Sequence, residues 1–501
     1  MSSAIQGEIA ALIEYALENG LIGPGDTAWA RNRILEILDL DGDDQPDASP
    51  TTAPGATIDD LLRPLLDDAA EREIFSPDTT ARRDLLDTAI MGSFLSPPSV
   101  INTRFWRDYE EQDPEAATTN FYEWNVASNY IRMPRIQKNK KWLHPTRYGA
   151  LVMTINLAKP ENDPRDIAAS LGNRDTAYPL CMLCRENEGY AGRLDHPARQ
   201  NLRLIGMDLA GDEWLLQYSP YLYYNEHCIF LSAQHRPMRI DRAAIARLLN
   251  LNEMFPHYFV GSNADLPIVG GSILTHDHFQ GGRFSFPMDS AGILDGFTYR
   301  ETQVEILDWP LSTVRLTGRS CPELLALADD LIESWRGYTD EAAEVFAFTG
   351  KTPHNTVTPI CRTGPNETVQ LDLVLRNNRT STEHPDGIFH PHVEVHPVKK
   401  ENIGLIEAMG LAVLPPRLNA DIETMARCIA DGTDLPAEQA HHQPMFDQIR
   451  GDVTLGDLDG ALLKVRRAVG DLFTLGLEHC GVFGPDPAPG ANRFLEHLGW
   501  R

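Results

Sequence analysis

The stretch Val269–Phe284, VGGSILTHDHFQGGRF, carries two histidines and a glutamine at alternate positions between two pairs of glycines. These three residues are His276, His278 and Gln280. In a strand, a period of two puts all three on one face and Asp277 on the other. The glycines let a ligand approach the backbone and leave N–H groups for phosphate oxygens. We expect a strand with one reactive imidazole beside an anion site; an inert surface strand is the alternative.

Strand-like runs and helical patterns surround this stretch in clusters. The strand-like runs are ALVMTINL (150–157), EWLLQYSPYLYY (213–224), EHCIFLSAQH (226–235), VEILDWPLSTVRL (304–316), HNTVTPICR (354–362) and VQLDLVLRN (369–377). The helical patterns are RAAIARLLNLNEMF (242–255), PELLALADDLIESWRGY (322–338) and ALLKVRRAVGDLFTLGLEHC (461–480). Helices between clusters of strands favour an α+β fold with mostly antiparallel sheet over a doubly wound one.

A second segment, FHPHVEVH (389–396), repeats the alternation of histidines with His390, His392 and His396. Two histidine-alternating strands roughly a hundred residues apart are compatible with a duplicated unit. We predict an acidic helical region over residues 1–95, a first mixed unit over 96–300 and a second over 301–501 with C-terminal helices.

The N-terminal region predicts helices interrupted by one loop. MSSAIQGEIAALIEYALENG has the spacing of an amphipathic helix and lacks the basic start and cleavage site of a signal peptide. The loop DGDDQPDASPTTAPGA (41–56) resembles a calcium site in one respect, because Asp39, Asp41 and Asp43 alternate at and just before its start. Asp44 stands where an EF-hand needs glycine, so we interpret the loop as a solvated linker.

The composition is that of an ordinary globular protein, with 42% hydrophobic and 23% charged residues among 501. The 72 acidic and 44 basic residues give a net charge of −28, a poor match to nucleic acid or an anionic membrane. No apolar run is long enough to span a bilayer. Seven cysteines without a disulfide framework indicate a reducing cytoplasm.

Cys181 and Cys184 in YPLCMLCRENEG have the spacing of half a zinc site. A second CxxC is missing, so the other ligands would be histidines or carboxylates, with His235 and His276 best placed by type. Two core thiols are the alternative. Phe279 and Gln280 after the HxH pair argue against a catalytic metal held by both histidines. P-loop, Rossmann and GxSxG motifs are also missing.

Four segments together resemble the galactose-1-phosphate uridylyltransferases of the histidine-triad superfamily, in their second, bacterial type. They are VGGSILTHDHFQGG, YPLCMLCRENEG, GKTPHNTVTPICR and HPVKKENIGLIEAMGLAVLP. The resemblance spans roughly residue 96 to the C-terminus, and the helical N-terminal region also suits the bacterial type. It implies two histidine-triad-like units with flanking helices, and transfer of UMP from UDP-glucose to galactose 1-phosphate through a uridylyl-histidine.

The resemblance assigns roles residue by residue. His278 matches the nucleophile, and Gln280 the glutamine that holds a phosphoryl oxygen. Residues that match the lining of the phosphate site are Asn263, Gly271 and Ser272, and those that match the four zinc ligands are Cys181, Cys184, His235 and His276. Four protein ligands imply a structural zinc. Local cations expected to assist are Arg132, Arg135 and Lys138, with Arg376, Arg379, Lys399 and Lys400.

The chain departs from the first type of the family in three places. Asp277 replaces a proline between the histidines, and one extra residue separates Ser272 from His276. The first type's iron site has no clean match here: His390 and His392 resemble two of its ligands, and a second metal there stays open. First-type relatives are dimers, and whether this chain also forms a homodimer stays open.

Rival functions remain open at this stage. A related transferase would use UTP directly or an N-acetylhexosamine 1-phosphate. A nucleotide-sugar binding protein would have lost the chemistry, and a histidine-triad hydrolase would pass the nucleotide to water. The intact HxHxQ argues against the binding protein. The chemistry also favours transfer, because a sugar phosphate is a stable leaving anion with a second pKa near ~6.

Overall fold

A computed structural model describes residues 3–40, 55–158, 165, 177–271 and 273–501. It divides into two compact units. The first is made of Met1–Lys138, Leu157–Leu222 and Glu226–His235; the second of Asn139–Asn156, Tyr223–Asn225 and Arg236–Arg501. The duplicated units expected over 96–300 and 301–501 stay a prediction.

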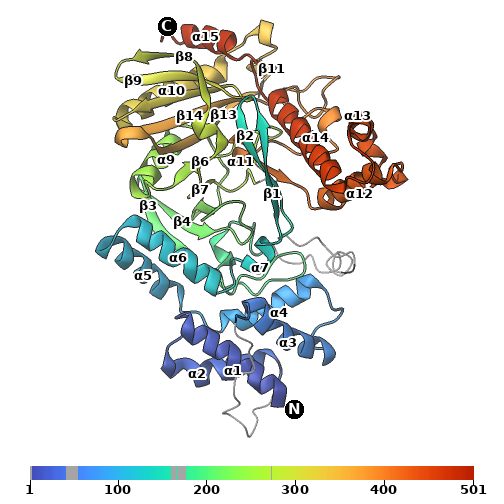
Figure 1. The fold of residues 1–501 in the computed structure, drawn as a ribbon. Coiled ribbons are helices and arrows are strands. Elements are labelled where there is room, and N and C mark those ends of the chain that lie inside the picture. The colour runs from blue at the N-terminus through green and yellow to red at the C-terminus, as the bar shows by residue number, and fades with distance from the viewer. Residues whose placement is uncertain (1–2, 41–54, 159–164, 166–176, 272) are drawn as a thin grey trace. The chain divides into compact units, whose positions relative to one another are not determined.

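The N-terminal region is helical, as predicted (Figure 1). Its helices are α1 (Ser3–Glu18), α2 (Thr27–Ile37), α3 (Ile58–Glu71) and α4 (Thr80–Gly92). The apolar face of α1 is buried through Ile9, Leu12 and Ala16, each completely inaccessible to solvent. Most of the predicted linker, residues 41–54, lies outside the described residues.

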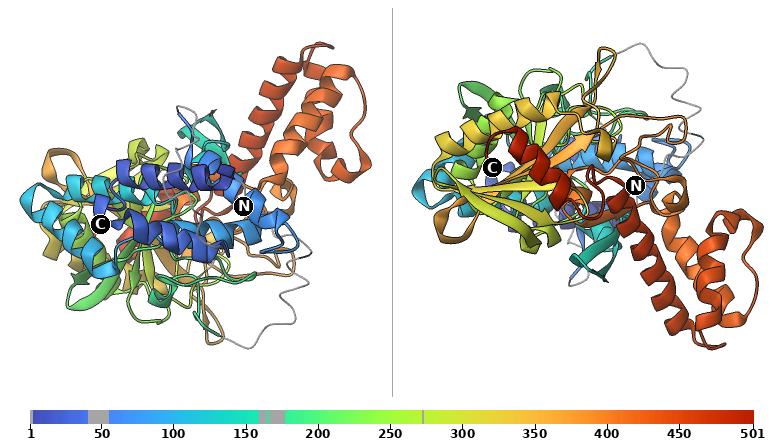
Figure 2. Two further views of the ribbon diagram at one scale, coloured as in Figure 1. Left: turned by 90° about the horizontal axis from the view of Figure 1, so that it is seen from below. Right: turned by 90° about the horizontal axis from the view of Figure 1, so that it is seen from above.

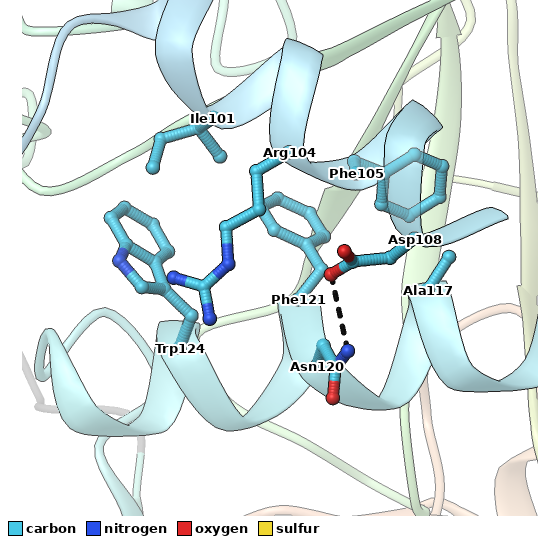
Figure 3. A pocket seen from close by; sticks show the side chains of 8 residues that line it. All are labelled: Ile101, Arg104, Phe105, Asp108, Ala117, Asn120, Phe121 and Trp124. Carbon is cyan, nitrogen blue, oxygen red and sulfur yellow. Dashed lines mark hydrogen bonds between the residues drawn. The ribbon is translucent and has the colours of Figure 1, made fainter. Parts of the chain in front are cut away.

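Helices α5 (Pro98–Glu111) and α6 (Pro114–Ala127) form a pair in the first unit, followed by the short α7 (Met133–Ile136). Phe105 and Phe121 meet edge to face at 5.8 Å between ring centroids, and Asn120 Nδ2 donates to Asp108 at 3.1 Å. Figure 3 shows these side chains facing one another around a pocket of about 10 Å³. Such a pocket holds one water molecule at most, so it is no substrate site.

Three antiparallel strands complete the first unit: β3 (Ile205–Leu209), β4 (Asp212–Tyr218) and β5 (Cys228–Ser232). Helix α5 is tied to β3 at Gly206, whose N–H donates to Asn102 Oδ1 at 2.7 Å and whose carbonyl accepts from Trp106 Nε1 at 2.9 Å. The last strand leads to His235 and so positions a predicted metal ligand.

The second unit contains a larger antiparallel sheet in the order β7-β6-β13-β14-β10-β9-β8. Its strands are β6 (Phe259–Gly261), β7 (His278–Gly282), β8 (Gly292–Tyr299), β9 (Thr302–Asp308), β10 (Thr313–Gly318), β13 (Asn355–Thr363) and β14 (Val369–Asn377). Helices α9 (Arg242–Met254) and α10 (Cys321–Gly337) pack on this sheet and bury Leu248 and Trp335. Strand β7 is therefore anchored to a large apolar core.

A smaller sheet pairs β1 (Lys140–Thr146) antiparallel and β15 (Leu411–Leu414) parallel with β2 (Gly149–Ile155). The remaining elements are the hairpin β11 (Phe348–Thr349) and β12 (Thr352–Pro353), and the helices α11 (Leu405–Ala408), α12 (Arg417–Asp431), α13 (Gln443–Ile449), α14 (Leu458–His479) and α15 (Ala488–His497). Figure 2 shows α12 and α14 side by side.

The α+β class with mostly antiparallel sheet is confirmed. Two local predictions are wrong. β7 begins only at His278, so His276 lies in a bend before the strand, and the segment at 389–396 contains the 3-10 turn Val393–Val395 instead of a strand. Pro391 in that segment has no N–H for a strand ladder. Among the described residues, no helix is long and apolar enough to cross a membrane.

Candidate active site and metal centre

His278 opens β7, and Gln280 pairs with Gly261 of β6 two residues later. The His278 ring is 6% exposed, and its Nδ1 lies 2.8 Å from the carbonyl oxygen of His276. A carbonyl only accepts, so Nδ1 carries the proton and Nε2 the lone pair. Burial lowers the pKa of His278 to about 4, against the opposite effect of that hydrogen bond. The ring is neutral at pH 7, with a defined nucleophilic nitrogen.

The residues predicted to line a phosphate site lie in the same unit. Gln280 is half-buried and stands two residues after His278 in β7. Asn263 is buried, and its Oδ1 accepts from the N–H of Leu405 at 2.8 Å. A Cβ on Gly271 would come within 2.7 Å of Asn263 Nδ2, so this glycine is required by close packing. Ser272 lies outside the described residues.

Asp277 lies between the two histidines and is 7% exposed. Its Oδ2 is 3.4 Å from Nε of Arg236, and its N–H donates to the Arg236 carbonyl at 2.7 Å. Burial nevertheless raises the pKa of Asp277 to about 6, while Arg236 and Arg247 act to lower it. The sequence patterns missed Arg236, because no spacing rule connects it with a residue 41 positions later.

Two of the three predicted substrate cations of the first unit, Arg132 and Arg135, are ion-paired within it. Arg132 is 7% exposed and makes two hydrogen bonds to Asp87, at 2.6 and 2.8 Å. Arg135 Nη1 donates to Asp84 at 2.8 Å. Lys138 is exposed. Since aspartates already compensate both guanidinium charges, these contacts favour a structural role for the two arginines.

The two cysteines of the CxxC motif converge in the first unit. Their sulfurs are 3.5 Å apart, and Cys184 Sγ lies 3.1 Å from His235 Nδ1. These separations resemble the edges of a tetrahedral shell around an ion with bonds of about 2.0–2.3 Å. Cys181, Cys184 and His235 of this unit belong to one of the groups of side chains, within the described parts of the chain, that can hold a metal ion.

Asn187 holds the backbone of the cysteine loop. Its Nδ2 donates to the carbonyls of Cys181 and Cys184 at 2.9 and 2.7 Å, and its Oδ1 lies 2.6 Å from His196 Nε2. Such outer contacts orient metal ligands. Sequence reasoning missed both Asn187 and His196, although Asn187 lies inside the quoted motif.

The second predicted metal region separates its two histidines. His390 binds Asn402 Oδ1 through Nε2 at 3.2 Å and the Pro391 carbonyl through Nδ1 at 3.1 Å. His392 instead belongs to a group with Glu394 and His479 that can hold an ion. The structure therefore brings His392, without His390, into a candidate metal group.

Comparison with known proteins identifies the family. Residues 37–237 match the N-terminal domain of galactose-1-phosphate uridyl transferase, and residues 251–443 match its C-terminal domain. The chain belongs to the galactose-1-phosphate uridylyltransferase family. The resemblance found in the sequence motifs is thus confirmed.

Members of this family from bacteria resemble the chain over nearly its whole length. The galactose-1-phosphate uridylyltransferase of Halalkalibacterium halodurans is 48% identical, with 99% of both chains covered. That of Bacillus subtilis is 44% identical, with 97% of this chain and 96% of the relative covered. A yeast Ap4A phosphorylase structure is 14% identical over 58% of this chain and 86% of its own, with a TM-score of 0.31, too low to inform the fold.

Proposed function

We propose that the protein transfers UMP from UDP-glucose to galactose 1-phosphate by two displacements at His278. The names of its relatives support this nucleotidyl transfer. The observation that carries the proposal is the neutral, buried imidazole whose Nδ1 proton is held by the His276 carbonyl. That arrangement gives a nucleophile without a separate general base.

In the first step, the Nε2 lone pair attacks the uridylyl phosphorus as the bond to glucose 1-phosphate breaks. In the second, a phosphate oxygen of galactose 1-phosphate attacks the same phosphorus, the P–N bond breaks and UDP-galactose leaves. Each leaving group is either a stable sugar phosphate anion or the imidazole, so no strong general acid is needed. The two steps form and break similar bonds, so the overall equilibrium lies near unity.

Negative charge on the transferring phosphoryl group needs hydrogen-bond donors in place before reaction. Gln280 stands two residues after His278 on β7, where its amide can donate to a phosphoryl oxygen. Gly271 packs against Asn263. Both residues precede β7 in the sequence and shape the loop that leads to it. We assign these three residues to the phosphate site.

We further propose that Cys181, Cys184, His235 and His276 bind a structural zinc ion. Two thiolates and two imidazoles are a donor set that zinc prefers, and four protein ligands leave no open position. Zinc would supply folding energy here and take no part in the transfer. His392, Glu394 and His479 are proposed as a second metal site. The cytoplasmic location and the homodimer stay predictions.

The intact mass of the protein after mixing with UDP-glucose alone tests the transfer. We expect an adduct of one UMP that galactose 1-phosphate discharges as UDP-galactose. UTP in place of UDP-glucose, with release of pyrophosphate, would identify the UTP-dependent rival, and discharge only by an N-acetylhexosamine 1-phosphate would identify the amino-sugar one. Free UMP without an acceptor would identify a hydrolase. A folded protein that binds UDP-glucose without an adduct would be a binding protein.

A further inference from the structure

Three side chains of the C-terminal helices meet at one point of the second unit. Asp421 lies on α12, and the neighbours His441 and His442 end the 3-10 turn Ala437–His442. Nε2 of His442 lies 3.2 Å from Asp421 Oδ2, and Nε2 of His441 lies 4.0 Å from the same oxygen. The two imidazole rings are 4.1 Å apart between centroids. Two ring nitrogens therefore face one carboxylate oxygen.

The spacing of these atoms fits the shell of a divalent cation. In a tetrahedral shell with bonds of about 2.0 Å, neighbouring ligand atoms are about 3.3 Å apart. The pair of His442 and Asp421 already has this spacing, and the exposed ring of His441 reaches it by a small rotation. Two imidazoles with one carboxylate also leave a coordination position open. The three side chains are therefore suited to an ion that exchanges with the solvent.

A buried amide beside the carboxylate gives a second, independent indication of a cation. Gln439 is 8% exposed, and its Nε2 donates to Asp421 Oδ1 at 3.0 Å. Its Oε1 is buried without a hydrogen-bond partner among the described residues, which is costly for an amide oxygen. A half-turn of the amide exchanges its two ends and places Oε1 beside Asp421 Oδ1. Two oxygens at that separation are stable around a shared cation, so Gln439 can supply a fourth donor.

Arg417 is the positive charge that lies beside Asp421 in this structure. Its Nη1 is 3.8 Å from Asp421 Oδ2, one helical turn earlier on α12, and its side chain is exposed. The guanidinium can therefore swing into solvent and leave its place to a metal ion. Since the two positive charges repel each other, Arg417 and the ion compete for the same carboxylate.

We propose that Asp421, His441, His442 and Gln439 bind a divalent transition-metal cation such as zinc reversibly, and that the ion clamps the turn Ala437–His442 to α12. This inference goes beyond the proposed UMP transfer and does not rest on it. In the alternative account, the hydrogen bonds of His442 and Gln439 to Asp421 only connect two helical segments, and zinc adds nothing.

Titration of the purified protein with Zn²⁺, in competition with a chromophoric chelator, tests the site. Ions at the other groups are common to all variants, so the comparison isolates this one. We expect His441→Asn to weaken one reversible equivalent by more than about 100-fold, since a direct ligand exceeds the 10–100-fold effect of outer contacts. Gln439→Leu should weaken it about tenfold. Glu438→Gln, at an exposed carboxylate of the same turn, is the control and should bind zinc like the wild type.

Removal of the competing charge separates the two accounts by the direction of the effect. Arg417→Gln should raise the affinity for zinc about fivefold at low salt, and less at high salt. A purely hydrogen-bonded connection predicts no change in zinc binding. The matched control is Arg427→Gln, which removes an exposed guanidinium 3.4 Å from Glu423 on the same helix and should leave the affinity unchanged.

Three results would overturn the inference. The first is wild-type zinc binding in both His441→Asn and Arg417→Gln. The second is wild-type binding in Asp421→Asn and Gln439→Leu together with loss in His441→Asn, because the ion would then sit on a surface histidine alone. The third comes from the wild type, by hydrogen exchange of residues 437–443. Saturating zinc should slow this exchange, and an unchanged rate contradicts the clamp even where zinc binds.

Discussion

Two segments of this chain share the pattern histidine, one residue, histidine, and they fold differently. In His276–Asp277–His278 the second histidine opens a strand, and its Nδ1 donates to the carbonyl of the first. In His390–Pro391–His392 the second histidine donates through Nε2 to Ile388 at 2.9 Å and precedes a 3-10 turn. The middle residues differ as well, since Asp277 donates through its N–H to the Arg236 carbonyl and Pro391 has no N–H.

The surroundings of the two segments differ in a second way. In the first segment the His278 ring is oriented by the His276 carbonyl, whereas His392 lies in a stack, with ring centroids 4.0 Å from His384 and 4.2 Å from His479. His479 also lines a pocket of about 450 Å³. A neutral ring with a fixed tautomer suits a nucleophile, and a cluster of rings with a glutamate suits an ion. We therefore propose different chemistries for the two segments.

The largest expected effect separates the two second histidines. His278→Ala should lower formation of the UMP adduct by at least about a thousandfold, because it removes the nucleophile. His392→Ala should leave adduct formation within about threefold of wild type. Intact-protein mass spectrometry with UDP-glucose measures both. An adduct that survives in His278→Ala and disappears in His392→Ala would reverse the assignment.

The sequence predicted the regular elements well, because periodic patterns report local structure. HNTVTPICR and VQLDLVLRN coincide with β13 and β14 to within one residue, and the C-terminal helical pattern lies within α14 except for Cys480, which follows its last residue. The alternation of histidines failed at 389–396, since Pro391 interrupts the strand ladder.

Residues of the candidate site that belong to a sequence motif could be predicted. Residues that reach the site through contacts between distant parts of the chain could not. The Arg236 carbonyl accepts from the N–H of Asp277, and His196 is hydrogen-bonded to Asn187 of the cysteine loop, and neither contact has a fixed sequence spacing. Arg132 shows the converse, since it was predicted as a local cation that assists the substrate, whereas Asp87 binds it. The periodicity of a sequence predicts which side of a helix or strand is buried, whereas the hydrogen-bond partners of a side chain become visible only in the fold.

Removal of a metal ligand is expected to have the next largest effect. Cys184→Ser should remove one equivalent of zinc and lower the melting temperature on the order of 5–10 °C, since a structural ion contributes several kcal/mol to folding. His479→Gln should remove a second, separate equivalent with a smaller shift. Elemental analysis and thermal unfolding measure these changes, with Glu438→Gln as a surface control. If both variants lost the same single equivalent of zinc, the two groups of side chains would belong to one metal site.

Replacing the middle residue of the second segment should have a moderate effect on stability alone. Pro391→Ala keeps the carbonyl that accepts from His390 and His396, and it removes a buried ring beside Gly476 of α14. We expect about 1–2 kcal/mol less stability, from lost burial and a more flexible unfolded chain. Denaturant unfolding measures this, and the rate of UMP transfer should not change. A large drop in that rate would mean that the second segment supports the reaction.

The smallest effect concerns pH in metal-free protein. Burial first, and then the neighbouring His392, lowers the pKa of His479 to about 4. The unfolded chain binds this proton below about pH 6.5 and the folded one only near 4, so stability falls as pH decreases through that window. The ring is half-buried, so we expect a loss on the order of 1 kcal/mol. His479→Gln should flatten this part of the pH profile in chemical unfolding, whereas His392→Ala should raise the pKa of His479 and flatten it only partly. If the free energy of unfolding of His479→Gln kept the wild-type dependence on pH, the stacked rings would already share a proton in the folded protein. The second segment would then differ from the first in charge as well as in shape.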